Sequence, residues 1–171
     1  SEDQIAEIVR NLAGQIAPDY KGERPILVSI LKAANIFTAD LVRALNKIGL
    51  RGVEQDFIIL RSRKDDLTQA ENIEVIRGFE IDKVRRRSLI IADTVDDTGL
   101  TGDKADQLAW DAGASSVRRV VLIDKDVPKK VDNQLDYVGL KVPNYWYYGY
   151  GLDSGQRHRG DPNIRVKIKK P

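Results

Sequence analysis

The order of apolar and polar positions along the chain predicts helices that alternate with short buried strands. Residues 5–16 carry apolar side chains at helical spacing after a capping-box pattern in the first four residues, so we expect a helix that ends near Pro18. Two further apolar stripes predict helices over 35–48 and 103–113. Short unbroken apolar runs are typical of strands that are buried on both faces. We interpret five apolar-rich segments as strands, at 25–31, 57–60, 73–76, 88–92 and 117–123, and the runs at 57–60 and 89–92 are unbroken.

The sequence of strand, helix and strand occurs twice, over 25–60 and over 88–123. This repetition predicts an α/β fold with a doubly wound parallel sheet, and such sheets bind ligands at the carboxyl ends of their strands. Residues 61–72 carry almost no apolar side chains, which predicts a mobile loop between two strands.

The alternation of strands and helices stops after Asp124. The segments expected beyond it are a charged loop at 125–133, a short strand at 137–140, an aromatic run at 143–150 and an edge strand at 164–168. We expect residues 1–171 to form a single domain. Its core would span about 20–124, and a small C-terminal hood would consist of about 125–171 together with the N-terminal helix.

A polar turn follows the apolar run that ends at Ala92. Residues 97–101 lead into the helix predicted at 103–113, so this turn presents backbone N–H groups and two hydroxyls at a helix N-terminus, as a phosphate site does. Carboxylates at 93, 96 and 97 would repel a phosphate on its own. A phosphorylated sugar with a divalent metal satisfies both groups of residues, because its hydroxyls and the metal meet the acids. A turn capped by Asp and Thr for helix stability is the simpler alternative.

Composition and charge narrow the choice of function. A chain of 171 residues with 42% hydrophobic and 32% charged residues suits one globular domain. Its net charge of +2 is too small to indicate nucleic-acid binding. The absence of cysteine excludes disulfides, thiolate metal sites and a cysteine nucleophile. We expect a cytoplasmic protein, because no apolar run approaches the roughly 20 residues that cross a membrane and the N-terminus lacks a signal-peptide pattern.

Two stretches of the chain resemble a known family. Residues 89–101 follow the pattern of three apolar residues, any residue, an acid, any three, then Asp-Thr-Gly-x-Thr, which is similar to the phosphoribosyl-pyrophosphate signature of the type I phosphoribosyltransferases. Residues 136–153 resemble the hypoxanthine-guanine branch, and the resemblance extends from about residue 26 to 164. It implies phosphoribosyl transfer from phosphoribosyl pyrophosphate to a 6-oxopurine, with Mg²⁺ as cofactor. We also expect a homodimer or homotetramer, with neither membrane nor nucleic acid as a partner.

The resemblance implies roles for the residues that would bind the phosphorylated sugar. Asp97 matches the acid near the purine N7, residues 97–101 the loop that holds the 5′-phosphate, and Asp93 the acid that binds the ribose hydroxyls. The positions implied for phosphoribosyl pyrophosphate are Asp93, Thr94, Asp96, Asp97, Thr98, Gly99, Leu100 and Thr101. Leu31-Lys32 matches the strained peptide of the pyrophosphate loop, and Arg159 matches an arginine that grips pyrophosphate.

Further roles concern the base, the metal and a lid. Lys125 matches the lysine that reads the purine 6-oxo group, Trp146 the aromatic residue that stacks on the base, and Tyr147 offers its backbone to the base edge. Asp153 is implied beside the purine and, with Asp93, as a magnesium ligand. The lid residues would be Ser62 and Arg63. Without the resemblance, the same tryptophan also fits a core position, the lysine a solvated surface and Asp153 a helix cap.

Five positions depart from the family pattern. Thr94 stands where the second of two adjacent acids is usual, so we expect a weaker hold on the magnesium complex of phosphoribosyl pyrophosphate than a two-acid site provides. Asp96 stands where an apolar residue is usual. Residues 33–34 are alanines in place of paired glycines, and Arg63 replaces a tyrosine of the lid.

Three functions remain open. The first is salvage of a 6-oxopurine, the second is phosphoribosyl transfer to uracil or xanthine, and the third is a regulator of the same fold that binds nucleotide or RNA without turnover. Lys125 and Trp146 favour a 6-oxopurine over uracil. The basic cluster at 83–87 is the one feature that favours the regulator, but we interpret it as a solvated edge in preference to a nucleic-acid patch, because no aromatic residues interleave with it. The sequence does not rank hypoxanthine, guanine and xanthine.

Overall fold

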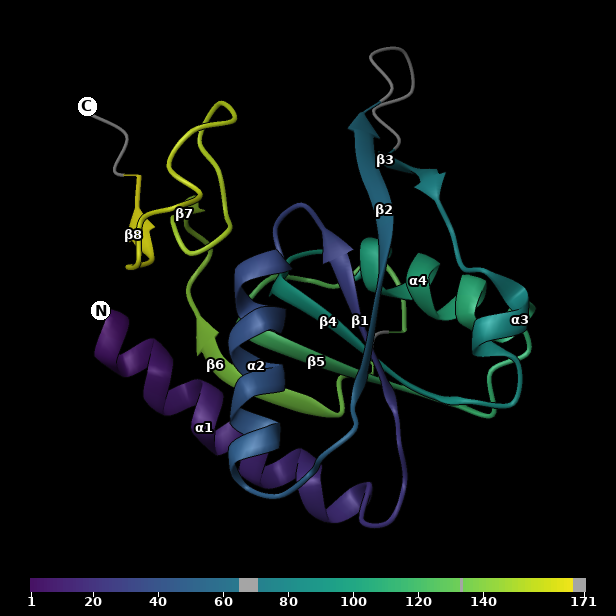
Figure 1. The fold of residues 1–171 in the computed structure, drawn as a ribbon. Helices are drawn as coiled ribbons and strands as arrows, with labels where there is room; N and C mark the ends of the chain where they lie inside the picture. Colours follow the sequence, from purple (N-terminus) through teal and green to yellow (C-terminus); the bar gives the residue numbers. More distant parts are fainter. Residues whose placement is uncertain (65–70, 133, 168–171) are drawn as a thin grey trace.

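The computed structural model describes residues 1–64, 71–132 and 134–167. A six-stranded sheet lies at its centre, with the strand order β3-β2-β1-β4-β5-β6 (Figure 1). Its strands are β1 (Ile26–Leu31), β2 (Glu54–Lys64), β3 (Glu71–Arg77), β4 (Ser88–Asp96), β5 (Ser116–Lys125) and β6 (Tyr137–Val142). All neighbouring pairs are parallel except β2 and β3, which are antiparallel. The predicted α/β class is therefore confirmed, with one antiparallel edge strand in a sheet for which the sequence indicated only parallel strands.

Helices cover both faces of the sheet. On one face lie α1 (Glu2–Asp19) and α2 (Asn35–Lys47), and on the other lie α3 (Ile81–Val84) and α4 (Leu100–Asp111). The predicted helix start at Ser1 is confirmed, because the Ser1 and Gln4 side chains form a capping box. The apolar stripe of α1 is buried against α2 and the sheet, as its helical spacing predicts.

The strand pair β2–β3 corrects the prediction of a mobile loop over 61–72. Residues 61–64 pair with residues 71–74 as antiparallel strands, and only 65–70 of that range lie outside the described residues. Backbone pairing joins these residues, and Arg61 lies 3.8 Å from Glu74 across the two strands. Residues 61–64 therefore belong to a strand although they carry no apolar side chain.

The expected hood is split between the main sheet and the C-terminal residues. Strand β6 pairs with β5 within the main sheet, and α1 packs against β6 and α2. The start of α1 also contacts the C-terminal residues, because the Glu2 N–H donates a 2.9 Å hydrogen bond to Asn163. The remainder is the C-terminal segment, residues 143–167, in which β7 (Tyr147–Tyr148) pairs with β8 (Arg165–Val166). In Figure 1 this segment stands above the sheet on the side of the N-terminus. The single-domain division as a whole stays a prediction.

The connections leave a crevice between β1 and β4. The chain leaves β1 through α2 on one face of the sheet and leaves β4 through α4 on the other. Two neighbouring parallel strands whose connections diverge in this way open a crevice at their carboxyl ends. The C-terminal segment docks at the same point, since a Cβ added to Gly151 would lie 2.0 Å from the Ala33 carbonyl oxygen. Only glycine fits this contact, and its φ of +93° is a second reason for glycine.

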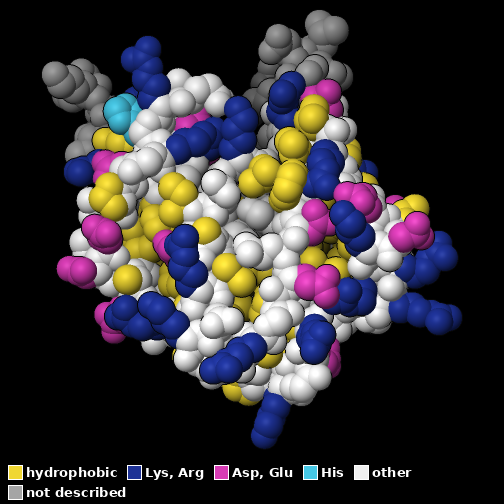
Figure 2. All heavy atoms as spheres, in the orientation of Figure 1, with side chains coloured by type: hydrophobic (Ala, Val, Ile, Leu, Met, Phe, Trp, Pro, Cys, Tyr) yellow, Lys and Arg dark blue, Asp and Glu magenta, His cyan; other side chains and the backbone are white. Residues whose placement is uncertain are grey.

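The surface mixes both signs of charge. On the face seen in Figure 2, Lys and Arg side chains are spread over the protein with Asp and Glu between them, instead of gathering into one basic field. Helices in the described ranges are all too short or too polar to cross a lipid bilayer.

Candidate functional site

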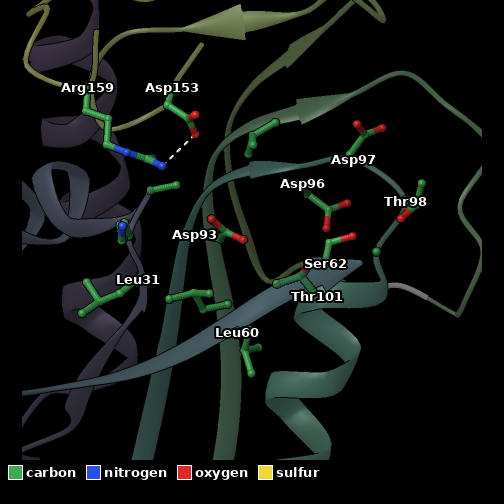
Figure 3. A pocket seen from close by; sticks show the side chains of 15 residues that line it. Leu31, Leu60, Ser62, Asp93, Asp96, Asp97, Thr98, Thr101, Asp153 and Arg159 are labelled. Atoms are coloured by element: carbon green, nitrogen blue, oxygen red, sulfur yellow. Dashed lines mark ion pairs between the residues drawn. The ribbon is translucent and has the colours of Figure 1, made fainter. Parts of the chain in front are cut away.

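A cavity of about 380 Å³ occupies the crevice beyond β1 and β4. It draws together residues from three strands, α4 and the C-terminal segment, as Figure 3 shows. The sequence-predicted residues that line it are Leu31, Lys32, Ser62, Asp93, Asp96, Asp97, Thr98, Gly99, Thr101, Asp153 and Arg159. Segments far apart in the sequence therefore meet at the point that the doubly wound fold specifies.

The turn at 97–101 forms the start of α4. Gly99 is the N-cap with a φ of +86°, a conformation that glycine adopts without strain. The N–H groups of the first helical turn lack partners within the helix, so this end of α4 can receive a phosphate. Thr98 and Thr101 add hydroxyls to the same wall of the cavity. The geometry agrees with the phosphate site that the sequence predicted.

A buried arginine lies beneath that first turn. A Cβ added to Gly102 would lie 2.2 Å from the Arg119 guanidinium, so the small residue makes room for it. Arg119 is buried and pairs with Asp106 at 3.0 Å. Burial raises the pKa of Asp106 to about 6, and the Arg119 charge opposes that shift. The helix that carries the phosphate loop is thus fixed to β5 by an ion pair.

Asp93 lies at the centre of the cavity (Figure 3). Its carboxylate accepts a 2.7 Å hydrogen bond from the Thr94 backbone N–H. Burial raises the pKa of Asp93 to about 7, the backbone hydrogen bond opposes the shift, and the neighbouring charge of Asp96 adds to it. A cation placed beside this carboxyl would favour its ionised form.

Two lysines bind the acids on the α4 side. Lys125 Nζ lies 2.8 Å from Asp97 Oδ2, and the Asp97 side chain is half exposed to the cavity. Lys129 Nζ lies 2.6 Å from both Asp96 Oδ2 and Asp124 Oδ1. The acid and the lysine that the family resemblance places at the base therefore contact each other directly, although Lys125 itself is not among the cavity-lining residues.

Asp153 and Arg159 face each other across the opposite wall, joined by the ion pair that Figure 3 marks. Arg159 Nη2 lies 2.7 Å from Asp153 Oδ1, and its Nη1 donates a 2.7 Å hydrogen bond to the Gly151 carbonyl. The other Asp153 oxygen accepts from the Gln156 backbone. Close by, the peptide bond between Leu31 and Lys32 is cis.

Besides Lys125, four predicted residues with described side chains lie outside the cavity lining. Thr94 is fully buried, and its hydroxyl donates to the Ala33 carbonyl, so it does not reach the cavity in this structure and its contact with ribose or metal stays a prediction. Successive strand residues point to opposite faces, and Asp93 takes the face toward the cavity. Leu100 begins α4 without reaching the lining. Trp146 is 59% exposed, and Tyr147 donates its hydroxyl to the Pro143 carbonyl, so neither contacts the cavity in this structure.

Other residues of the site were missed. Leu60 and Val95 form an apolar part of the cavity wall. Nothing in the sequence distinguished them from other apolar residues of predicted strands. Lys129 falls in the segment predicted as a charged loop, although it follows a buried strand and lies four residues after Lys125. The side chain of the predicted lid residue Arg63 lies outside the described part of the chain.

Comparison with known proteins gives a consistent result. A family model described as a phosphoribosyl transferase domain matches residues 1–155. The hypoxanthine-guanine phosphoribosyltransferase of Bacillus subtilis is 30% identical over 166 residues, which is 97% of this chain and 89% of that protein. A bifunctional TilS/HprT protein of Listeria monocytogenes is 32% identical over 97% of this chain, which spans about a quarter (25%) of that relative's length. The structure of Trypanosoma cruzi hypoxanthine phosphoribosyl transferase matches with a TM-score of 0.85 and 30% identity, covering 97% of this chain and 88% of that one.

Proposed function

This chain belongs to the phosphoribosyl transferase family, and we propose that it transfers the 5-phosphoribosyl group from phosphoribosyl pyrophosphate to hypoxanthine or guanine. The products would be IMP or GMP and pyrophosphate. The observation that carries the proposal is the cavity itself, where a helix N-terminus for a phosphate faces carboxylates for sugar hydroxyls. Relatives named for this activity, over nearly the whole chain, support the choice of base.

The sugar phosphate would span the cavity. The 5′-phosphate lies at residues 97–101, where the first N–H groups of α4 and two threonines can donate to it. Asp93 accepts from the ribose hydroxyls at the centre. The pyrophosphate then lies toward Lys32 and Arg159, which supply positive charge for the departing group.

Asp93 and Asp153 are the two acids of the cavity that could bind magnesium. Within the described ranges, no cluster of three or more acids or histidines could hold a metal alone. Magnesium commonly uses one or two carboxylates, with substrate phosphates and waters completing its shell. Asp93 and Asp153 line the same cavity and can supply these carboxylates, with Asp153 exchanging its Arg159 contact for the ion. When bound, the ion would neutralise charge on the pyrophosphate leaving group.

The base would contact Asp97 and Lys125. A bond forms between a purine nitrogen and C1′ while the bond from C1′ to pyrophosphate breaks, and the proton of the base passes to Asp97. Lys125 donates to the 6-oxo group. Because these side chains pair at 2.8 Å without a base, binding of the base replaces their mutual contact by contacts with the purine. Trp146 and Tyr147 would reach the base after a movement of the C-terminal segment.

The test is turnover of each base with phosphoribosyl pyrophosphate and magnesium. We expect nucleotide and pyrophosphate from hypoxanthine and guanine, and much less from xanthine or uracil. Arg159→Gln serves as a variant that keeps a polar side chain but removes the charge from the pyrophosphate end, and its loss of rate shows that the described cavity is used. Turnover of uracil alone, or binding of nucleotide without turnover, would contradict the proposal. The homodimer or homotetramer stays a prediction, which sedimentation of the purified protein tests.

A further inference from the structure

Two buried acids lie side by side where β4 and β5 end. Asp96 and Asp124 are partners in the register of the two parallel strands, and 6% and 9% of their surfaces remain exposed. Neighbouring carboxylates repel each other, and burial makes each charge more costly. The Lys129 ammonium group lies 2.6 Å from both. One lysine thus bridges the two acids, of which Asp96 lines the cavity.

The same ammonium group also reaches the backbone of both strand ends. Lys129 Nζ donates to the Asp97 carbonyl oxygen at 2.8 Å and lies 3.3 Å from the Lys125 carbonyl oxygen. These are the backbones of the residues whose side chains form the 2.8 Å pair at the edge of the cavity. A lysine has three N–H donors, and here all three are directed at oxygens of these two strand ends.

A backbone contact extends this connection to the phosphate loop. The Lys130 N–H donates a 2.9 Å hydrogen bond to the Thr98 carbonyl oxygen. The turn after β5 is held at its other end by the Asp126 N–H, which donates to the Val142 carbonyl of β6 at 2.8 Å. The turn therefore lies between the loop after β4 and the end of β6, and Lys129 is the side chain at its centre.

We propose that Lys129 is a positioning residue that fixes Asp97 and Lys125 relative to each other through its contacts with Asp96 and Asp124. The assignment of Asp97 and Lys125 to the base rests on the proposed function, whereas the placement of the two backbones does not. Asp96 stands where the family usually has an apolar residue, so this chain holds the wall of its cavity with buried charge where packing usually serves. Burial alone would lower the pKa of Lys129, but its hydrogen bonds to Asp124 and Asp96 raise it, so the lysine stays charged.

The first measurement compares Lys129→Met with Lys129→Arg. Methionine keeps the length and apolar stem but removes all contacts of the ammonium, and we expect faster hydrogen exchange at 96–101 and 124–130 without change in α1. We expect the KM for the base to rise about 10-fold or more, the scale of a small misplacement of reacting groups, and the KM for phosphoribosyl pyrophosphate to change much less. Lys129→Arg should partly restore the slow hydrogen exchange and the low KM for the base. Lys21→Met, which removes an exposed lysine after α1, is the matched control.

A second set of variants separates positioning from simple neutralisation of charge. The variant Asp96→Asn with Asp124→Asn removes both buried charges, and adding Lys129→Met to it leaves none of the three. If Lys129 positions the strand ends, the triple variant keeps the fast exchange and the raised KM for the base relative to the double variant. Wild-type exchange and KM in the triple variant would overturn the proposal, as would equal rises in both KM values for Lys129→Met. Should the wild type fail to turn over any purine, the proposed function fails, and the exchange measurement still decides the role of Lys129.

Discussion

The Thr94 hydroxyl donates a 3.0 Å hydrogen bond to the carbonyl oxygen of Ala33. This bond joins the end of β4 to the loop that follows β1, so it crosses the crevice in which the cavity lies. The same carbonyl oxygen lies against Gly151 of the C-terminal segment. Three segments that surround the cavity therefore meet at one backbone oxygen, and the Thr94 hydroxyl holds the loop at 31–33.

Thr94→Val should lower the free energy of unfolding by about 1–2 kcal/mol, because valine keeps the shape but leaves the Ala33 carbonyl without its donor. It should also raise the KM for phosphoribosyl pyrophosphate, since the loop at 31–33 loses its tie to β4. Urea denaturation and steady-state kinetics measure the two effects. Thr38→Val is the control, because it removes another buried hydroxyl, bonded to Ser29 and Ala34, and should cost stability without this change in KM.

The structure reverses the expectation that an acid at position 94 would tighten substrate binding. Thr94→Asp would place a carboxylate in a fully buried position against a carbonyl oxygen, where two acceptors face each other. We expect a larger loss of stability than for Thr94→Val and weaker binding of phosphoribosyl pyrophosphate. Calorimetric titration in magnesium would show the change, and tighter binding by the aspartate variant would contradict this account of the site.

Asp97→Asn should keep the fold and lower kcat by about 10²-fold or more, because an amide cannot take the proton of the base. Its amide oxygen can still accept from Lys125, so the pair at the edge of the cavity survives. Single-turnover kinetics with saturating substrates measure the chemical step. A rate like that of the wild type would remove Asp97 from the role of general base.

Lys125→Ala should raise the KM for the base far more than the KM for phosphoribosyl pyrophosphate, since the lysine would donate only to the oxo group. Its Nζ lies 2.8 Å from Asp97 and it is mostly buried, so the variant also frees the Asp97 carboxylate. Steady-state titration of each substrate at saturation of the other gives the two constants. Equal effects on both would place Lys125 outside the base site.

Gly151→Ala should destabilise the protein more than Gly155→Ala. Both glycines have positive φ, so alanine at either position costs about 1–2 kcal/mol of backbone strain. Gly155 has open space around it, whereas a Cβ at Gly151 would lie 2.0 Å from a backbone oxygen that cannot move alone. We expect a further loss of about 1–3 kcal/mol at position 151, as for other overpacked sites, and a raised KM for phosphoribosyl pyrophosphate. Similar unfolding curves for the two variants would show that the segment does not dock there.

Local signals in the sequence were sufficient for much of this fold. Strands buried on both faces and helices with one apolar stripe leave clear periods, so β1, β4, β5, α1, α2 and α4 could be predicted. The direction of β3 and the place of β6 could not be, because both depend on which strand offers a free edge. Residues 61–64 carried no apolar signal, so their pairing with 71–74 could not be predicted from local pattern.

In the site too, contiguous motifs could be predicted from the sequence, whereas contacts between distant residues could not. Residues 97–101 are contiguous, so the amino-acid sequence alone shows their pattern. Ala33 lies 61 residues from Thr94 in the sequence, and Asp96 lies 33 residues from Lys129. Only the folded chain shows that Thr94 supports a loop and that Lys129 bridges two acids. For Trp146 the family resemblance implied a base contact, and in the folded chain the side chain is largely exposed and outside the cavity lining, so this contact stays a prediction.

The stability of the protein should fall in acid through a cluster far from the cavity. The Tyr137 hydroxyl donates to Asp19 at 2.6 Å, and Arg118 pairs with the same carboxylate. The Tyr137 hydrogen bond lowers the pKa of Asp19 below its ordinary 3.8, burial opposes this, and the Arg118 charge adds to it. A carboxyl whose pKa is lower in the folded state contributes stability above its ordinary pKa, and that contribution is lost as the pH falls through the lowered value.

Asp19→Asn should therefore lower the Tm at pH 7, and the difference from the wild type should shrink as the pH falls below about 4. Thermal unfolding across this range measures it, with Glu7→Gln, an exposed acid of α1, as the control. A difference in Tm that stays constant from pH 7 to pH 3 would show that the Asp19 charge is not what these contacts stabilise.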